Sequence, residues 1–529
     1  GGDRMEPEEP TSVEGLLAAI SDQGVEMFSA EQRLLPYCER LLVEMRDCKK
    51  RVFNSMEKAC QTEEGVIFHH TVGLIFHLDD LRVLRYRLTL AERSCICSFL
   101  MRAATAPNIS YEQASFVYEM MGNFLKSSVK FGDHMTVDWQ PMWHQLRKIC
   151  EISARNKHAS SSASLLKLGN SIAKTVSIAR RFFAPAAATQ MMRLFRAWTS
   201  NPCNSETTLA VAFICAFMPG TADNVSELVD EMMELWSWKG RDGFWDFNFL
   251  MLFNRFALHQ GYRVEWEKYL GIIYSKLMAI VELQIGSLPN NMGSHPPASA
   301  TGFFIPYDMC WGEATHFGSG LVVQLLSSRH PESFAFLRKL VHAVDMFYHP
   351  AQSQEQTFLT DLMDGLCYRY TLRLNDERDG LRSHLAPRDD YLQQADNDSF
   401  TEIMIPLVVK AIFSEFPPLR QFSFLALKYL SAISPSLVLD PLMKSTDGCV
   451  DNLTETHRAP SALTAWSFAV RPMLREKGAA ERLMTFLPDL PSAMLSVDEE
   501  KSNAAFLLLG LVLECVPFFP CDESHPDFL

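Results

Sequence analysis

Two groups of residues in the sequence have types that could do chemistry, but neither has the spacing that a catalytic or metal site requires. His69, His70 and His77 have no cysteine or carboxylate at ligand spacing, so we interpret them as satisfied or solvated histidines. The Gly-Ser-Gly segment at 318–320 lacks the spacing of a nucleophile elbow and falls in an expected helix, which favours small-residue packing. No phosphate-binding loop ending in Lys-Ser or Lys-Thr is present. The sequence therefore predicts neither catalytic residues nor a metal site.

A basic cluster between positions 147 and 181 is the candidate for anion binding. Its members are Arg147, Lys148, Arg155, Lys157, His158, Lys167, Lys174, Arg180 and Arg181. On successive helices they could line a groove for an acidic partner or a polyphosphate. The alternative is a solvated helix face beside acidic neighbours, which is what charge runs on amphipathic helices usually are. If a cofactor binds here, the candidates to hold it are Arg147, Lys148, Arg155, Lys157, Arg180 and Arg181.

Composition indicates a well-buried protein that is too long for one compact core. The chain has 529 residues, of which 47% are hydrophobic and 21% charged, and its net charge is -14. The negative balance disfavours direct nucleic-acid binding. Thirteen cysteines without a CxxC pair are typical of reduced thiols in the cytosol or nucleus. No signal or membrane-spanning segment is recognisable, so we expect no membrane association.

The segment 398–445 shows the structural unit most plainly. Ser399 with Glu402 three residues later predicts a capping box and a helix start. Pro406 inside this helix predicts a bend, and Phe416-Pro-Pro418 predicts the turn into a second helix. A third helix is expected from Ser434-Pro435. Antiparallel amphipathic helices joined by short proline turns indicate an all-α fold, an α-solenoid of HEAT/ARM-like helix-pair repeats.

Helical periodicity extends over most of the chain. The expected helices are 34–59, 66–78 (weakly), 89–104, 111–129, 138–153, 163–182, 186–198, 206–217, 224–237, 244–259 and 265–285. We divide the chain into a flexible acidic N-terminus (1–30), HEAT-like repeats (31–285), a Pro/Gly/Ser-rich loop (286–311), further repeats (312–373), a charged insertion (374–398) and a last set of repeats (399–520).

Recurrent spacings support a HEAT-type repeat. Trp139 and Trp266 each open a helix and are 127 residues apart, close to three repeats of roughly 42 residues. Helix starts expected near Gly312, Glu355 and Ser399 follow one another at 43 and 44 residues. The two tryptophans are therefore predicted to be structural anchors between repeats.

Several short motifs recur in the same order in one known family. They are Leu34-Leu-Pro-Tyr-Cys-Glu-Arg-Leu41, Trp139-Gln-Pro-Met-Trp143, Arg181-Phe-Phe-Ala-Pro185, Phe244-Trp-Asp246, Asn254-Arg-Phe-Ala-Leu258, Tyr262-Arg-Val-Glu-Trp266, Phe347-Tyr-His-Pro350 and Leu453-Thr-Glu-Thr-His457. Through them, residues 34 to 520 resemble the amino-terminal part of the large HEAT-repeat, ATP-independent proteasome activators, the proteasome activator complex subunit 4 family. The resemblance adds Phe347, Tyr348, His349 and Pro350 to the expected structural anchors.

The resemblance implies a regulatory protein without catalytic residues of its own. Members of this family form a solenoid dome on the end (alpha) ring of the proteasome core particle. They promote ATP- and ubiquitin-independent degradation of peptides, unfolded proteins or acetylated histones. The resemblance further implies a location in nucleus and cytoplasm and a role in DNA repair. It also implies binding of inositol phosphates, but assigns no residues of this chain to them.

Two departures from the family pattern led us to expect an amino-terminal fragment. The chain ends in Asp527-Phe-Leu529, which differs from the hydrophobic-Tyr-any tripeptide by which family members anchor, and no bromodomain-like segment is recognisable. The alternative function is a nuclear-transport-type HEAT-repeat scaffold that binds basic cargo on an acidic surface. A hydrolase is a third and weaker alternative, because no nucleophile-base or metal arrangement is recognisable.

Overall fold

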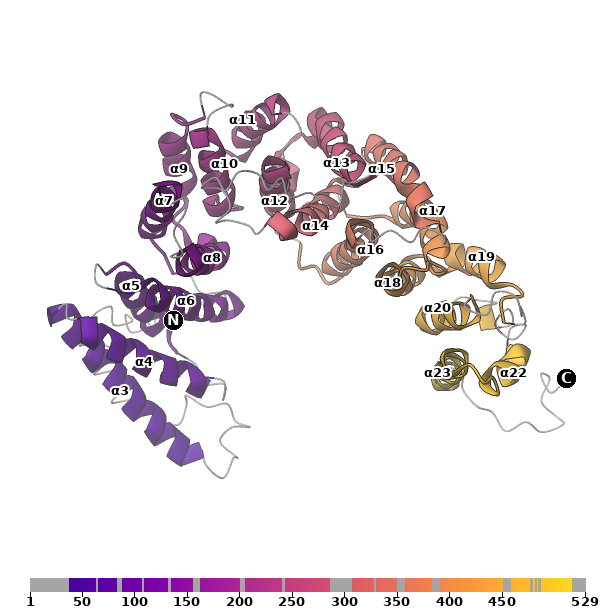
Figure 1. Cartoon of the computed structure of the whole chain (residues 1–529), viewed down its shortest axis with the longest axis horizontal. Coiled ribbons are helices and arrows are strands. Elements are labelled where there is room, and N and C mark those ends of the chain that lie inside the picture. Colours follow the sequence, from indigo (N-terminus) through magenta and orange to yellow (C-terminus); the bar gives the residue numbers. More distant parts are fainter. Residues whose placement is uncertain are drawn as a thin grey trace, which may run out of the picture. The chain divides into compact units, whose positions relative to one another are not determined.

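The computed structural model shows a stack of helices (Figure 1). The structure describes residues 38–62, 65–82, 88–106, 109–131, 135–155, 162–199, 205–239, 243–285, 307–327, 330–349, 357–382, 391–450, 458–475, 479–480, 483 and 487–515. These residues contain no β-strand, so the predicted all-α class is confirmed. No described helix is both long enough and apolar enough to cross a membrane.

The described helices fall into two compact units. The first unit contains α3 (Cys38–Thr62), α4 (Gly65–Arg82), α5 (Leu90–Ala104), α6 (Tyr111–Phe131), α7 (Gln140–Arg155), α8 (Ser162–Ala179), the short 3-10 helix η2 (Arg180–Phe182), α9 (Ala187–Phe195) and α10 (Ser205–Phe217). In this unit α6 lies between α5 and α8, and α8 also contacts α7 and α10. Each helix therefore covers its apolar side against its neighbours in the stack.

The second unit repeats this arrangement over a longer stretch. It contains α11 (Val225–Trp238), α12 (Gly243–Gln260), η3 (Gly261–Arg263), η4 (Trp266–Tyr269), α13 (Leu270–Ile285), α14 (Tyr307–Leu325), α15 (Pro331–Val344), η6 (Asp345–Tyr348), α16 (Thr357–Arg378), α17 (Gln394–Ala411), α18 (Pro417–Ile433), α19 (Pro435–Thr446), α20 (Arg458–Met473), η8 (Leu487–Asp489), α22 (Leu490–Met494) and α23 (Glu499–Cys515).

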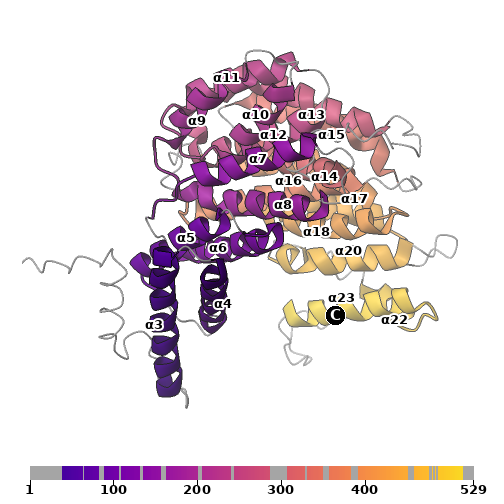
Figure 2. The ribbon, with the colours of Figure 1, turned by 60° about the vertical axis from the view of Figure 1, so that its left-hand side comes forward.

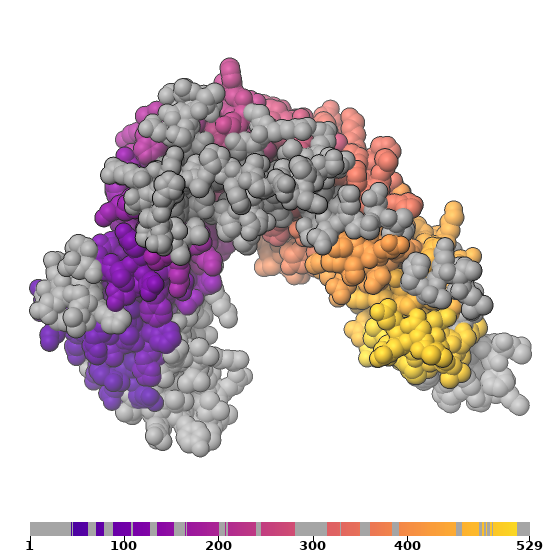
Figure 3. Space-filling model, in the orientation of Figure 1, coloured from indigo at the N-terminus to yellow at the C-terminus, as the bar shows by residue number. Residues whose placement is uncertain are grey.

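Two layers of helices make up this second unit. One layer runs α13, α15, α17, α19, and the other runs α16, α18, α20, α23, with successive members in contact (Figures 1 and 2). In the space-filling view, side chains close the space between the neighbouring helices of the orange and yellow segments (Figure 3). The unit that the sequence predicted, a helix pair that must stack on the next pair, is confirmed.

Local sequence signals account for the starts of several helices. Thr89 accepts a hydrogen bond from the Glu92 amide, while Glu92 accepts one from the Thr89 amide, so a capping box opens α5. Pro417 and Pro435 open α18 and α19, as expected for proline in a first turn. Pro406 lies inside α17, and the helix continues beyond it to Ala411. The long helix expected from 34 and the helix weakly expected from 66 are α3 and α4.

The predicted start of α17 is wrong. The capping box is formed by Gln393 and Asp396, six residues before the expected Ser399 and Glu402. Both arrangements satisfy the local rule, but Asp396 is buried at 3% exposure, and this packing selects the earlier start.

Three other boundaries also differ from the prediction. The expected loop 286–311 ends earlier, because α14 already begins at Tyr307. The expected charged insertion 374–398 is helical at both ends, since α16 continues to Arg378 and α17 begins at Gln394. The regular spacing of helix starts is wrong as well. The helices begin at Tyr307, Thr357 and Gln394, and α17 belongs to a different layer from α16.

The spacing of the two tryptophans has the predicted meaning. Trp139 immediately precedes α7 and Trp266 opens the turn before α13. Three consecutive helix pairs lie between these positions in the sequence, namely α7 with α8, α9 with α10 and α11 with α12. The interval therefore corresponds to three repeats of the helix-pair unit.

Candidate functional site

Two members of the predicted basic cluster make contacts within the first unit. The Arg147 guanidinium lies 5.7 Å from the ring centre of Trp143 and 5.2 Å from that of Trp198, and its Nε donates to Glu151 at 3.1 Å. Arg180 donates from Nη1 to the carbonyl oxygen of Ala216. These contacts join α7 to the chain after α9, and η2 to α10. We therefore assign Arg147 and Arg180 a packing role.

The other described members of the cluster lie on the surface. Lys148, Lys167, Lys174 and Arg181 are exposed, while the side chain of Arg155 and all of Lys157 and His158 lie outside the described residues. Lys167, Lys174 and Arg181 are seven residues apart, so they follow one side of α8 and its extension η2. Anion binding by this cluster remains a prediction.

Trp139 is the centre of an aromatic cluster in the first unit. It is 5% exposed, and its ring lies 6.2 Å from Trp143 and 6.3 Å from Phe217. Phe183 stacks on Phe217 from the other side, and the Val137 amide donates to the Phe182 carbonyl at 2.7 Å. The Trp139-to-Trp143 and Arg181-to-Pro185 motifs thus meet around Phe217, which is consistent with the predicted anchor.

Trp266 has a comparable place in the second unit. Its side chain is 7% exposed, its indole nitrogen donates to the carbonyl of Gly261 at 3.0 Å, and its ring meets Phe253 edge to face. Nearby, buried Asp246 accepts a hydrogen bond from the indole of Trp236 at 2.7 Å. The Trp-rich motifs of this region therefore form a packed core with one satisfied buried carboxylate.

The expected anchor at 347–350 is only partly an anchor. Tyr348 is fully buried, but Phe347 is half-buried and His349 is exposed, and Pro350 lies outside the described residues. The preceding Asp345 accepts hydrogen bonds from Lys410 of α17 at 2.5 and 2.6 Å. The ion pair therefore fixes η6 against α17, while the buried ring of Tyr348 lies close to Cys367 and Asp361 of α16. The sequence does not distinguish the inward Tyr348 from its neighbours, because the segment is a 3-10 turn without helical period.

The Gly-Ser-Gly segment is packing, as predicted. Ser319 is fully buried in α14 and its hydroxyl donates to the His316 carbonyl at 2.9 Å. A Cβ placed on Gly318 would lie 2.6 Å from a methyl carbon of Leu277, and one on Gly320 would lie 2.6 Å from the amide oxygen of Asn254. Small residues are needed here because α14 approaches its neighbours closely.

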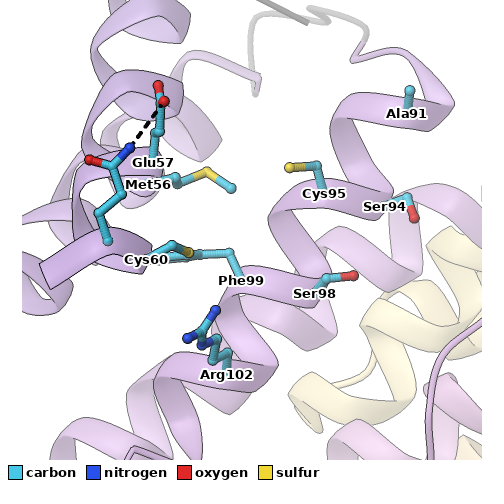
Figure 4. Close-up of a pocket in the computed structure, with 10 residues that line it drawn as sticks. Met56, Glu57, Cys60, Ala91, Ser94, Cys95, Ser98, Phe99 and Arg102 are labelled. Atoms are coloured by element: carbon cyan, nitrogen blue, oxygen red, sulfur yellow. Dashed lines mark hydrogen bonds between the residues drawn. The ribbon is translucent and has the colours of Figure 1, made fainter. Parts of the chain in front are cut away.

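A cavity of about 530 Å³ lies between α3 and α5 (Figure 4). Met56 and Cys60 of α3 face Cys95 and Phe99 of α5 across it. Burial raises the pKa of the Cys95 thiol to about 11, and nearby Cys60 raises it further. A protonated thiol is a poor nucleophile, so this cavity lacks the activated thiolate of a cysteine hydrolase.

A polar cavity of about 450 Å³ lies in the second unit. Its walls come from the α12–α13 connection, the end of α14 with the following turn, and the end of α16. Arg373 closes one wall, since its Nη1 donates to the carbonyls of Val323 and Leu326 at 2.6 and 2.8 Å. These carbonyls belong to the end of α14, so a guanidinium neutralises the negative end of that helix.

Glu377 completes the wall of this polar cavity. Its Oε1 accepts from Arg373 Nε at 2.7 Å and its Oε2 accepts from the Leu392 amide at 2.7 Å. Sequence reasoning missed both side chains, because they were assigned to an insertion or its edge. Their opposite charges four residues apart were the available signal.

Within the described ranges, no group of three or more His, Cys, Asp or Glu side chains is arranged to hold a metal ion. His70 and His77 are exposed on α4. The predicted lack of catalytic and metal residues remains a prediction.

Comparison with known proteins relates most of the chain to one family. Residues 337–527 match the family described as "Proteasome activator complex subunit 4, mid HEAT repeats region". The chain is 22% identical to proteasome activator complex subunit 4 of Xenopus laevis and 21% identical to that of Homo sapiens, with 93% of this chain and 26% of each relative covered. It is 22% identical to proteasome activator subunit 4 of Arabidopsis thaliana over 66% of this chain and 20% of that relative.

The chain is similar, at low identity, to proteasome activator complex subunit 4. It spans about a quarter of the length of the animal proteasome activator complex subunit 4 proteins that it matches. Two of the motifs that carried the resemblance, 347–350 and 453–457, fall within the matched mid HEAT-repeat region. The second of these lies outside the described residues.

Proposed function

We propose that this chain is part of a non-catalytic proteasome activator. The observation that carries the proposal is the similarity to proteasome activator complex subunit 4 over 93% of the chain. The two-layer stack of helix pairs supports it, because such stacks bind other macromolecules over extended surfaces. In this proposal the helices form part of a dome on the alpha ring of the core particle and promote ATP- and ubiquitin-independent degradation.

Co-purification and a peptidase assay together test this function. The full-length protein that contains this chain is isolated from native extract, and core-particle subunits are expected to accompany it. Added to purified core particle, it is expected to increase hydrolysis of a fluorogenic peptide without ATP. Absence of core-particle subunits and of stimulation would refute the proposal. Binding of basic cargo that depends on a small GTPase would instead support the nuclear-transport alternative.

The remaining family expectations belong to the same proposal. Unfolded proteins or acetylated histones are the proposed substrates, DNA repair is a proposed context, and nucleus and cytoplasm are the proposed locations. Inositol phosphates are proposed ligands of the exposed lysines and arginine of α8 and η2. Charge reversal at Lys167, Lys174 and Arg181 tests that ligand, because these side chains are exposed and the fold should tolerate the change. Unchanged binding of inositol hexakisphosphate would remove this basic face as the site.

A further inference from the structure

The polar cavity of the second unit contains a buried charged group, the guanidinium of Arg382. Arg382 is 7% exposed, and its Nε and Nη1 are buried and have no hydrogen-bond partner among the described residues. Its Nη1 lies 3.6 Å from Glu377 Oε1, and that oxygen already accepts a hydrogen bond from Arg373 Nε at 2.7 Å. Buried guanidinium groups are normally paired, so this one points to a group that is bound in solution.

A second unpartnered atom lines the same cavity. The side-chain oxygen Oε1 of Gln324, near the end of α14, is buried and accepts no hydrogen bond from the part of the chain that the structure describes. The cavity thus offers donors from Arg382 and an acceptor from Gln324. A ligand that satisfies both carries an anionic oxygen group together with an N–H or O–H donor.

The charges around the cavity define the kind of anion. Its lining carries three guanidinium groups and three carboxylates. The carboxylates have partners, because Glu265 pairs with Lys268 at 2.5 Å, His330 Nδ1 lies 2.7 Å from Glu267, and Glu377 pairs with Arg373. Among the described residues, Arg263 has no carboxylate within ion-pair distance. Arg382 lies 3.6 Å from Glu377 and is also close enough to Asp376 for that charge to raise its pKa.

Burial disfavours the charged form of Arg382. Desolvation, together with the nearby charge of Arg373, lowers the pKa of Arg382 to about 10. The guanidinium remains charged at neutral pH, so an anion would relieve an existing electrostatic penalty. The three guanidinium groups and three carboxylates of the lining balance, so the cavity accommodates one negative charge more readily than the two charges of a phosphate dianion.

We propose that this cavity binds an acidic polypeptide segment through one carboxylate. The Arg382 guanidinium donates to the carboxylate, and Gln324 Oε1 accepts a backbone N–H of the same segment. The volume of about 450 Å³ exceeds that of a single carboxylate and accommodates an acidic side chain with adjoining backbone. Exposed Tyr262 and Arg263 lie at the lining where the segment would enter. The proposal is independent of proteasome binding.

Titration of short peptides into the whole chain tests this inference. The probes are N-acetyl-Gly-Glu-Gly-amide, the matched glutamine peptide, N-acetyl-triglycine with a free carboxyl end, and inorganic phosphate. Calorimetry is expected to show binding of the glutamate peptide or of the free carboxyl end, and these two arms distinguish a side chain from a chain terminus. Binding of the glutamine peptide with equal affinity, of phosphate alone, or of no probe would overturn the proposal.

Two variants locate the binding. Arg382→Gln is expected to weaken peptide binding by about tenfold or more, the usual range for a lost charge-assisted hydrogen bond. Arg378→Gln is the matched control, since Arg378 is exposed at the end of α16, four residues before Arg382, and does not line the cavity. Without peptide, Arg382→Gln should melt no lower than the unmodified chain, because it removes an unpartnered buried charge. A large loss of helix content in Arg382→Gln, or an equal effect of both variants, would make Arg382 a structural residue and reject the site.

Discussion

The buried ion pair between α3 and α5 allows a quantitative test of how the first unit holds together. Lys49 Nζ lies 2.5 Å from Glu92 Oε1, and the two side chains are 0% and 1% exposed. Burial lowers the pKa of Lys49, and the charge of Glu92 opposes this shift. The pair therefore exists because each charge compensates the other in a site from which water is excluded.

Lys49→Met should leave the Glu92 carboxylate buried without its counter-ion. Removal of one partner of a buried pair typically destabilises a protein by about 3–5 kcal/mol. For a unit of the size of the first one, this corresponds to a melting temperature lower by on the order of 10 °C. The double variant Lys49→Met, Glu92→Gln should recover most of the loss, since glutamine keeps an acceptor for the Thr89 amide and carries no charge.

Differential scanning calorimetry of the whole chain measures these shifts, and hydrogen exchange assigns the loss to α3 and α5. Lys50→Met is the control, because Lys50 is a half-buried neighbour of Lys49, and its effect should stay within about 0.5 kcal/mol. If Lys49→Met leaves the melting temperature of the first unit unchanged, the ion pair does not stabilise that unit. If the double variant melts no higher than the single one, the two charges are not coupled.

Three further changes probe other parts of the stack. Trp139→Ala should destabilise the chain by about 3–5 kcal/mol, because the ring is 5% exposed. Trp238→Ala is the control and should have little effect, because that side chain is 72% exposed. If chemical denaturation gives both variants the same midpoint, Trp139 is not an anchor. Burial, followed by the charge of a nearby aspartate, raises the pKa of Asp364 to about 6. The stability that the protonated Asp364 carboxyl contributes is therefore full below about pH 4 and is lost as the pH rises through 6. Asp364→Asn should therefore raise the melting temperature at pH 7.5 and change it little at pH 4, and the same shift at both pH values would contradict this. Gly365→Ala would place a Cβ 2.5 Å from a serine hydroxyl and should destabilise the chain by about 1–3 kcal/mol. Gly271→Ala places a Cβ with nothing within 4 Å and should stabilise the chain by up to about 1 kcal/mol. Urea titrations that rank the two variants in the opposite order would show that the helices around Gly365 move apart to accept the methyl group.

Much of the fold could be predicted because helix signals are local. Apolar spacing, the Thr89 cap and the prolines at 417 and 435 act within one or two turns, so they mark helices without knowledge of partners. Boundaries were less predictable where two local signals compete. Gln393 with Asp396 and Ser399 with Glu402 both suit a helix start, and burial of Asp396 decided between them.

The candidate sites were less predictable than the helices, because they depend on contacts between residues that are far apart in the sequence. Sequence reasoning selected the basic cluster, yet the structure uses Arg147 and Arg180 for packing. It missed the polar cavity, because Arg382 and Gln324 lie 58 residues apart and neither belongs to a motif. A charge run is visible in a sequence, but whether each charge is solvated or buried depends on the neighbouring repeats.

The sequence by itself determined the helical class, the pairing of helices and the resemblance to the proteasome activators, since these depend on short-range periodicity and ordered motifs. Only the tertiary structure decided which polar side chains meet. Lys49 reaches Glu92 across 43 residues, and Arg373 reaches the end of α14 across 47 to 50 residues. Such contacts form when stacked helices exclude water, and their free energy depends on that exclusion rather than on residue type alone.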